Sequence, residues 1–354
     1  MKKIRKIILA VILIFLLAVL GYVLYVVLAF DRLEDELPLE TEGKAERVLS
    51  EGEPLRILSY NVGFGAYSDD YSFFMDGGTE SRARSEEAVY ENIGGAMEAA
   101  KDAQPDLILF QEVDADGDRS WHIDERELVK EAFPEKEAVF AENYDSPYLL
   151  YPFREPHGAN RAGLMTLSEF PIASAERRSL PIEGGFMKFV DLDRCYAVHR
   201  IPVESGRELV LYNFHLSAYT SDGTIAEEQM KMLFADMKAE TEKGNAVIAG
   251  GDFNKDILGN SAEVFGVSGD AYTWAQPVPK ELIPDGLRIV VPFDEADPKA
   301  SCRNADRPYG KDSFLVTVDG FIVSDAVKVE KSRVMPYGYR FSDHDPVFMD
   351  FKIE

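Results

Sequence analysis

Apolar residues are arranged in two different ways along the chain. From Ile7 to Phe30 they form one uninterrupted run, whereas beyond residue 54 they occur in short runs separated by segments rich in Gly, Pro and Asp. A helix formed by the first run is long enough to cross a bilayer core of about 30 Å. The short runs are typical of buried strands and of the apolar faces of helices. The pattern therefore predicts an N-terminal apolar helix followed by a folded region.

The folded region is expected to combine strands and helices. The apolar runs predict strands at residues 55–61, 106–112, 162–167, 186–190, 195–203, 209–216, 247–252, 315–323, 327–334 and 346–351. A helix is expected after the N-cap Ser85, because apolar residues from Val89 to Met97 recur every three or four positions. Two more helices are expected at residues 124–133 and 225–240. This order of elements favours two sheets packed face to face, with helices outside.

Polar side chains stand where several of these runs end. The run that starts at Val247 passes through two glycines to Asp252, and Asn254 follows two positions later. The other polar residues at the ends of apolar runs are Asn61, Glu112, His215, Asp319, Asp343 and His344. Each of them alone is compatible with an ordinary turn or a hydrogen-bonded core residue. Together they indicate one site at the ends of strands, where core packing fixes the positions of side chains.

The charge of the chain restricts its partners. Sixty-three acidic residues outnumber 38 basic ones, which gives a formal net charge of −25. Residues 1–30 add four positive charges and no negative one, so the rest of the chain is more acidic still. Such a surface repels polyanions at long range, which counts against loose, nonspecific binding of nucleic acid. It does not exclude a phosphate substrate that is bound through a metal ion.

The N-terminal run is interpreted as a signal anchor. It is longer than the apolar core of a signal peptide, and it lacks a convincing small-x-small cleavage site. Residues 1–6 are expected in the cytoplasm, residues 7–30 in the cell membrane, and residues 31–54 as an acidic, solvated linker to an exported domain. A cleaved and secreted form is the alternative. The two cysteines, Cys195 and Cys302, leave a disulfide open, because the sequence does not fix their distance.

Six short motifs occur in one order along the chain. They are Ser-Tyr-Asn61, Phe-Gln-Glu112, Asn213-Phe-His215-Leu, Gly251-Asp252-Phe-Asn254, Val318-Asp319-Gly-Phe and Ser342-Asp343-His344-Asp345-Pro346-Val. This set resembles the motifs of the endonuclease/exonuclease/phosphatase superfamily, the DNase I-like group that also includes neutral sphingomyelinases and inositol polyphosphate phosphatases. The resemblance implies one α/β domain over residues 55–354, a four-layer α/β/β/α sandwich of two mainly antiparallel sheets. It also implies metal-dependent hydrolysis of phosphoesters.

The resemblance further implies a metal site. Glu112 is expected as the main ligand, with Asn61 and Asp343 beside it. Carboxylate and carboxamide oxygens suit a hard cation that keeps some of its waters, so Mg²⁺ is the expected cofactor and Mn²⁺ the other candidate. Such an ion would neutralise the charge that develops on the phosphoryl oxygens.

The remaining motif residues are expected to act on water and phosphate. By resemblance, Asp252 orients or deprotonates the attacking water, and Asn254 contacts the phosphate. His344 is paired with Asp319 in a His–Asp dyad, and its role as acid, base or electrostatic stabiliser stays open. His215 corresponds to a histidine that donates to the scissile phosphate.

Two arginines are candidates for binding the substrate. Arg161 precedes a predicted strand in a region where members of the family place substrate contacts, and an ordinary exposed arginine is the alternative. Arg303 belongs to residues 299–311, which contain four basic residues and one acidic residue in an otherwise acidic chain. This stretch is expected to guide phosphate toward the site, and a solvated loop is the alternative.

The sequence therefore predicts a membrane-anchored, extracytoplasmic phosphoesterase, most simply a phosphodiesterase. Nucleic acid, a phospholipid and a phosphorylated metabolite remain open as substrates, and no obligate protein partner is evident. In the long loop 62–84, Phe73 and Phe74 are expected to pack on the domain, with contact to lipid as the alternative. A non-catalytic binding protein that retains the fold is the rival interpretation, and it would be expected to have lost part of the site.

Overall fold

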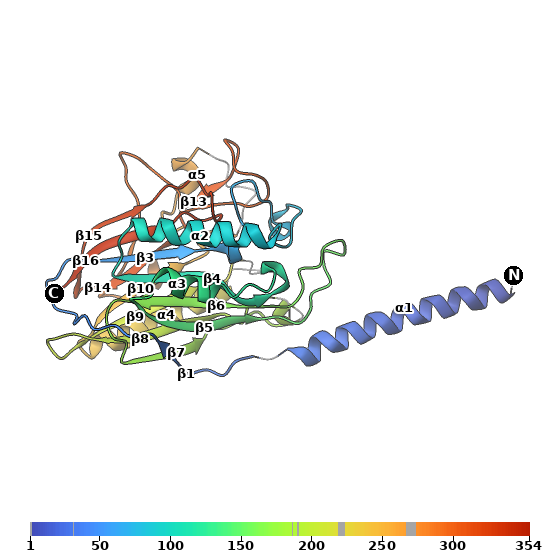
Figure 1. Cartoon of the computed structure of the whole chain (residues 1–354), viewed down its shortest axis with the longest axis horizontal. Coiled ribbons are helices and arrows are strands. Elements are labelled where there is room, and N and C mark those ends of the chain that lie inside the picture. Colours follow the sequence, from blue (N-terminus) through green and yellow to red (C-terminus); the bar gives the residue numbers. More distant parts are fainter. Residues whose placement is uncertain (1, 31, 186, 190, 219–223, 267–273) are drawn as a thin grey trace.

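The computed structural model of the chain describes residues 2–30, 32–185, 187–189, 191–218, 224–266 and 274–354. Helix α1 (Lys2–Ala29) extends away from a folded domain (Figure 1). Of the helices in these described ranges, α1 is the one that is long and apolar enough to cross a membrane, and a signal sequence would have the same properties. Its buried residue is Val26, close to the end that joins the domain.

Two seven-stranded sheets form the domain. The first has the strand order β1 (Leu37–Leu39), β7 (Ser174–Ser179), β8 (Cys195–Pro202), β9 (Glu208–His215), β10 (Ala246–Asp252), β14 (Asp319–Ser324) and β11 (Leu287–Val290). The second has the order β15 (Val327–Val334), β16 (Val347–Ile353), β3 (Leu55–Asn61), β4 (Leu107–Gly117), β6 (Asn160–Ser168), β5 (Glu137–Asp145) and β2 (Thr41–Glu42). A separate pair consists of β12 (Cys302–Arg303) and β13 (Leu315–Val316).

Helices cover the outer faces of both sheets (Figure 1). Helices α2 (Glu86–Asp102) and α3 (Glu125–Ala132) pack on the second sheet, and α4 (Thr224–Glu242) packs on the first. The side chain of Ser85 caps α2 by accepting a hydrogen bond from Ala88 N, as expected. The short helix α5 (Ser261–Val264) lies beside β13. Single 3₁₀ turns occur at Gly63–Gly65, Phe74–Asp76, Asp118–Ser120, Met187–Phe189 and Lys280–Leu282.

The main core lies between the two sheets. Inward-facing residues of both sheets meet there, including Ile57 and Leu109 from the second sheet and Leu211 and Ile248 from the first. Separate apolar clusters join each sheet to its own helices. The domain is therefore the four-layer α/β/β/α sandwich that the sequence predicts.

Each sheet contains one strand–helix–strand unit, β3–α2–β4 in one and β9–α4–β10 in the other. The strands of each unit are parallel, whereas the other neighbouring strands are antiparallel. Parallel strands that are joined by a helix end at the same edge of their sheet. The two units place these ends together, at the end of the sandwich from which α1 extends (Figure 1).

The acidic segment 31–54 is not the solvated linker that we expected. Its strands β1 and β2 pair with β7 and β5, one in each sheet. Arg32 Nε lies 2.7 Å from Asp193 Oδ1, and Leu49 is fully buried. The sequence misses this packing because edge strands of two or three residues have no measurable periodicity. Residue 31 itself lies outside the described residues.

Apart from two, the other expected elements are present, β3 and β15 with the expected ends and the rest with shifted ends. The strand expected at 315–323 is divided into β13 and β14. Residues 186 and 190 of the strand expected at 186–190 lie outside the described residues, and a 3₁₀ turn lies between them. Cys195 and Cys302 are both buried and free, so the structure contains no disulfide between them.

Candidate active site

The expected polar residues line up at one end of the sandwich, although Glu112 lies inside β4 and not at its end, and Asn254, Asp343 and His344 lie just outside the strands. They are Asn61, Glu112, His215, Asp252, Asn254, Asp319, Asp343 and His344. Asp252 ends β10 and pairs in register with His215 on β9 and with Asp319 on β14. The register of one sheet therefore fixes three of these residues side by side, which supports the interpretation of the strand ends as a shared site.

The backbone around Asp252 adopts uncommon conformations. A Cβ atom at Gly251 would lie 1.9 Å from the carbonyl oxygen of Phe214, so only glycine fits beside β9. Asn254 and Glu112 have positive φ angles of 48° and 56°. Non-glycine residues in this region cost on the order of 1 kcal/mol or more, and such strain is frequent at functional sites.

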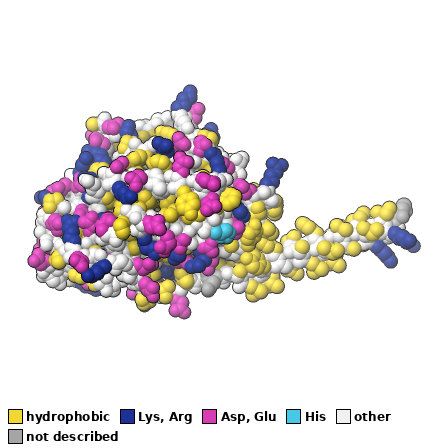
Figure 2. Space-filling view, viewed as in Figure 1, with side chains coloured by type: hydrophobic (Ala, Val, Ile, Leu, Met, Phe, Trp, Pro, Cys, Tyr) yellow, Lys and Arg dark blue, Asp and Glu magenta, His cyan; other side chains and the backbone are white. Residues whose placement is uncertain are grey.

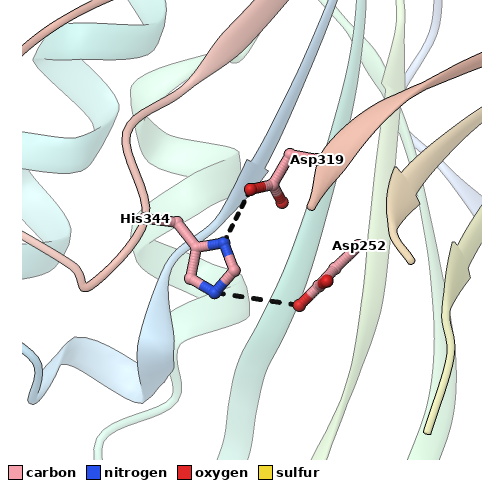
Figure 3. Close-up of side chains that lie close together, drawn as sticks. All are labelled: Asp252, Asp319 and His344. Atoms are coloured by element: carbon pink, nitrogen blue, oxygen red, sulfur yellow. Dashed lines mark hydrogen bonds and ion pairs between the residues drawn. The ribbon is translucent and has the colours of Figure 1, made fainter. Parts of the chain in front are cut away.

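Asp252, Asp319 and His344 form the centre of the site (Figure 3). His344 Nδ1 lies 2.8 Å from Asp319 Oδ2, and His344 Nε2 lies 3.7 Å from Asp252 Oδ2. Burial alone would lower the pKa of His344, but the adjacent Asp319 carboxylate outweighs burial and raises this pKa well above its ordinary value. His344 therefore lies between two carboxylates, and the raised pKa favours its imidazolium form.

Asp252 receives hydrogen bonds on both carboxylate oxygens. Asn254 N donates to Oδ1 at 2.8 Å, and Asn61 Nδ2 donates to Oδ2 at 3.2 Å. Burial raises the pKa of Asp252, and the negative charge of Asp319 raises it further, against the opposing effect of His344. A carboxylate with a raised pKa is better suited to take up a proton near neutral pH.

His215 differs in charge from His344. Its Nε2 lies 3.5 Å from Asp252 Oδ2, and its Nδ1 has no hydrogen-bond partner among the described residues. Burial lowers the pKa of His215 well below its ordinary value, and the nearby positive charges of Arg194 and His344 add to this effect. A neutral and a cationic histidine therefore flank the same carboxylate.

Glu112 and Asp343 offer carboxylate oxygens to a cation. Burial raises the pKa of Asp343 to about 6, and the charge of Glu112 adds to it. Two carboxylates that repel one another at the bottom of a cavity fit a hard divalent ion, which would relieve the repulsion. Asn61 Nδ2 donates to Glu112 Oε1 at 3.1 Å, and its Oδ1 accepts from Gly63 N at 3.0 Å. Its amide nitrogen thus holds the Glu112 carboxylate, and the expected role of its oxygen as a metal ligand stays a prediction.

A second group also has the spacing of a metal site. One ligand atom each from Asp252, Asp319 and His344 lies within 4.8 Å of the others. The hydrogen bond between His344 Nδ1 and Asp319 leaves Nε2 of the imidazole as a ligand atom, provided that the ring is neutral. This group is therefore a second candidate for holding a cation, beside Glu112 and Asp343.

Six of the polar residues form the floor of a cavity of about 420 Å³, namely Glu112, His215, Asp252, Asn254, Asp343 and His344. Two buried arginines that the sequence did not single out, Arg119 and Arg194, also line it. Arg119 Nη2 lies 2.7 Å from Asp114 Oδ1, whereas Arg194 Nη1 donates to the carbonyl oxygen of Leu216 at 3.0 Å. Arg194 Nε has no partner among the described residues. Both arginines bring positive charge to the floor. The sequence analysis missed them because neither belongs to a motif or follows the end of an apolar run.

The two arginines that the sequence did single out lie elsewhere. Arg161 does not line the cavity, and its Nη2 instead bonds Glu142 Oε2 at 2.9 Å on the surface. Arg303 lines the cavity but is fully buried, and its Nη2 donates to the carbonyl oxygens of Ser68 and Tyr71 at 2.8 and 3.2 Å. Arg303 is therefore buried instead of exposed on a rim, and it ties the loop 62–84 to the domain. Its expected contact with the substrate stays a prediction.

Aromatic residues of the same loop form one wall of the cavity. Phe73 is buried, and its ring packs against Tyr67 at 5.2 Å and against His157 at 6.1 Å between ring centroids. Phe74 packs against His157 and Tyr151 at 5.8 and 5.7 Å. The expectation that this pair packs on the domain agrees with the structure.

Comparisons with known proteins agree with this architecture. The chain matches the model of the endonuclease/exonuclease/phosphatase family over residues 58–344. The sequence has no match among curated proteins. Solved structures share the fold at low sequence identity, among them the three that follow. An endonuclease/exonuclease/phosphatase from Beutenbergia cavernae is 17% identical, with a TM-score of 0.56 over 85% of this chain and 72% of that one.

The second structure is that of ANGEL2, a 2′,3′-cyclic phosphatase in complex with adenosine-2′,3′-vanadate. It is 16% identical, with a TM-score of 0.55 over 89% of this chain and 99% of that one. The third is the human Nocturnin catalytic domain with a bound sulfate anion. It is 16% identical, with a TM-score of 0.51 over 89% of this chain and 98% of that one. The family match spans most of the chain and includes the strands that carry the site. The chain therefore belongs to the endonuclease/exonuclease/phosphatase family.

Proposed function

We propose that the protein is a metal-dependent phosphoester hydrolase, acting most simply on phosphodiesters. The observation that carries this proposal is the environment of Asp252, a buried carboxylate flanked by a neutral His215 and a cationic His344. One group that can accept a proton and one that can donate a proton thus lie on the same floor. A non-catalytic binding protein would have no need to retain this arrangement.

The proposed reaction begins at Asp252. Its carboxylate orients a water molecule and takes its proton while the water oxygen forms a bond to phosphorus. The ester P–O bond then breaks, and the imidazolium of His344 stabilises the developing negative charge or gives its proton to the leaving oxygen. His215 donates a hydrogen bond to the phosphate, and Asn254 assists by fixing Asp252 Oδ1 through its backbone N–H. Asp319 keeps the imidazole of His344 charged and oriented.

Glu112 and Asp343 would hold the divalent ion. Bound there, Mg²⁺ or Mn²⁺ supplies positive charge that neutralises the phosphoryl oxygens. Asn61 positions both Glu112 and Asp252 through one amide nitrogen. Its oxygen accepts one hydrogen bond from Gly63 N and keeps a second lone pair for the expected role as a metal ligand.

We further propose that α1 anchors the protein in the cell membrane with the domain outside the cytoplasm. The basic residues 2–6 precede the apolar part of the helix, which favours their retention on the cytoplasmic side. Protease added to intact cells should digest the domain. Protection of the domain from that protease would contradict this orientation.

The catalytic proposal is tested with bis-p-nitrophenyl phosphate and the full chain in detergent micelles. We expect hydrolysis with Mg²⁺ or Mn²⁺, loss of activity in EDTA, and recovery when the metal is restored. Glu112→Gln should raise the Mg²⁺ concentration needed for half-maximal rate and lower the maximal rate about 100-fold, because it removes a charged ligand. Glu176→Gln, at a carboxylate on the surface of β7, is the control. Equal rates with Mg²⁺ and with EDTA would contradict the metal-dependent reaction.

A further inference from the structure

The end of α1 is tied to a loop that borders the cavity. Tyr22 Oη donates to the carbonyl oxygen of Tyr148 at 3.1 Å and accepts from Leu150 N at 3.1 Å. Tyr148 N in turn donates to Tyr25 Oη at 3.0 Å. The loop 148–153 is thus held against the last two turns of the helix. Tyrosine is enriched at the two surfaces of a membrane, where its ring is in apolar surroundings and its hydroxyl meets polar groups.

The same loop presents apolar side chains to the outside. Phe153 is 83% exposed, and Leu150, Tyr151 and Met75 beside the cavity are also exposed. Together with the apolar surface of α1 they form a continuous apolar region where the helix meets the domain (Figure 2). We call the loop 148–153, Met75 and the end of α1 the apolar face. Exposed clusters of this kind mark surfaces that are covered by a partner or a membrane.

The cavity connects the apolar face with the catalytic floor. Its lining includes Tyr22 and Val26 from α1, Leu149 and Leu150 from the loop, and the catalytic groups at its other end. Val26 is only 1% exposed, although the rest of α1 is almost entirely exposed. A volume of about 420 Å³ is in the range of sites for small molecules. It is sufficient for a phosphorylated head group but not for two long acyl chains.

We propose that the substrate is a phospholipid of the bilayer that α1 spans, and that the apolar face lies in the outer surface of that bilayer. This inference rests on the proposed function and adds the substrate class to it. The head group enters the cavity along α1 and the loop 148–153, while the acyl chains stay in the membrane. Attack of water on phosphorus breaks one P–O ester bond, which yields a phosphate monoester and an alcohol.

The charge of the domain favours a lipid over a polymeric nucleic acid. The net charge of −25 repels a polyanion, whereas a phospholipid is brought to the floor by its own membrane and needs no long-range attraction. The basic groups at the floor, Arg119 and Arg194, are buried within the cavity and form no extended basic surface for a nucleic-acid backbone.

The test compares two substrates with the same enzyme. The full chain is reconstituted in vesicles of phosphatidylcholine, phosphatidylethanolamine and phosphatidylglycerol, and the lipid products are measured by mass spectrometry in Mg²⁺. Hydrolysis of bis-p-nitrophenyl phosphate is measured in parallel. Phe153→Glu should lower lipid hydrolysis at least tenfold, because a carboxylate opposes insertion of the loop, and should leave hydrolysis of the soluble diester within twofold.

Val48→Glu is the matched control. Val48 is 62% exposed and lies far from the cavity. Its neighbour Leu49 forms a β-bridge with Val203, which follows β8 at the end of that strand remote from the catalytic floor. This variant should change neither rate.

Turnover of the soluble diester without any lipid product would overturn the lipid inference and leave the proposed function standing. Turnover of neither substrate would contradict both. Equal losses of lipid hydrolysis in Phe153→Glu and Val48→Glu would also overturn the role of the apolar face.

A second measurement examines the contact with the membrane directly. In Phe153→Trp the additional tryptophan fluorescence should be quenched by vesicles that contain lipid brominated near the glycerol, whereas that of Val48→Trp should not. Equal quenching at both positions, or none at Phe153→Trp, would show that the loop does not lie in the bilayer surface.

Discussion

The floor and the mouth of the cavity are built in different ways. The floor consists of polar side chains from strand ends, such as Asp252 and His215, whose neighbours are fixed by the register of a sheet. The mouth consists of apolar side chains from α1 and from loops, and contacts such as that between Tyr22 and Tyr148 join segments that are far apart in the sequence. The chemistry of the site and the access to it are therefore encoded in separate parts of the chain.

This separation has a practical consequence. In the proposed mechanism, changes at the floor should affect every substrate alike, because each phosphoester would meet the same proton acceptor and the same imidazolium. Changes at the mouth should affect stability or the choice of substrate and leave the chemistry of a small soluble diester intact.

The largest effect is expected from His344→Gln. The glutamine can still form a hydrogen bond, but it carries no positive charge and does not act as an acid or base near neutral pH. We expect kcat for bis-p-nitrophenyl phosphate to fall about 10³-fold, within the range for the loss of a general acid or base. Thermal unfolding should show that the variant is folded. A fall of less than fivefold would exclude His344 from the reaction.

Asp319→Asn should lower kcat about 100-fold, because it keeps the imidazole in place but removes the adjacent charge. The Asp319 carboxylate raises the pKa of His344, so the variant should lose the imidazolium at lower pH than the wild type. The alkaline limb of the pH–rate profile should accordingly move to lower pH. An unshifted limb would show that the titration of His344 does not limit the rate.

Gly251→Ala tests how the floor is positioned. Because the added Cβ would collide with the backbone of β9, we expect a decrease of about 2–3 kcal/mol in the free energy of unfolding, measured in urea. Gly94→Ala, at an open position on α2, should instead stabilise the protein by about 0.5–1 kcal/mol. Equal effects of the two variants would contradict the close approach of β9 and β10.

The smallest effect is expected from His157 in the aromatic wall of the mouth. Burial lowers the pKa of His157 to about 3, against about 6.5 in an unfolded chain. Below pH 6.5 the unfolded chain binds a proton that the folded chain does not, so stability decreases as the pH falls. Between pH 7 and pH 5 this linkage amounts to about 2 kcal/mol.

His157→Gln should remove that part of the pH dependence of unfolding, while its activity on the soluble diester at pH 7 should remain close to that of the wild type. His122→Gln, at an exposed histidine, is the control for the substitution itself. If unfolding of His157→Gln depended on pH as strongly as unfolding of the wild type, folding would not lower the pKa of His157.

The sequence predicts the floor well for a physical reason. A buried strand has a strong apolar signal, and the polar residue that ends it is conspicuous, as Asp252 is after Val247. The same signal located β3 and β15 with their observed ends. The sequence did not show how the Asn61 side chain is oriented. Gly63 N donates a hydrogen bond to the amide oxygen, which turns the amide nitrogen toward the Glu112 carboxylate.

Contacts between segments that lie far apart in the sequence could not be predicted in the same way. Strands β1 and β2 are too short to have a period, and their pairing partners lie far along the chain. Arg303 stands in a basic stretch that suggested an exposed rim, yet loop carbonyl oxygens bury its guanidinium. Long-range contacts of this kind depend on the complete fold and not on local composition.

The most direct test of the account is the rate of bis-p-nitrophenyl phosphate hydrolysis in Mg²⁺ for Asp252→Ala against Asp325→Ala. Asp325 is an exposed aspartate that follows β14 at the end opposite the catalytic floor. We expect Asp252→Ala to lose at least 10³-fold in kcat and Asp325→Ala to match the wild type. Equal rates for Asp252→Ala and the wild type would contradict the assignment of this floor as the site of hydrolysis.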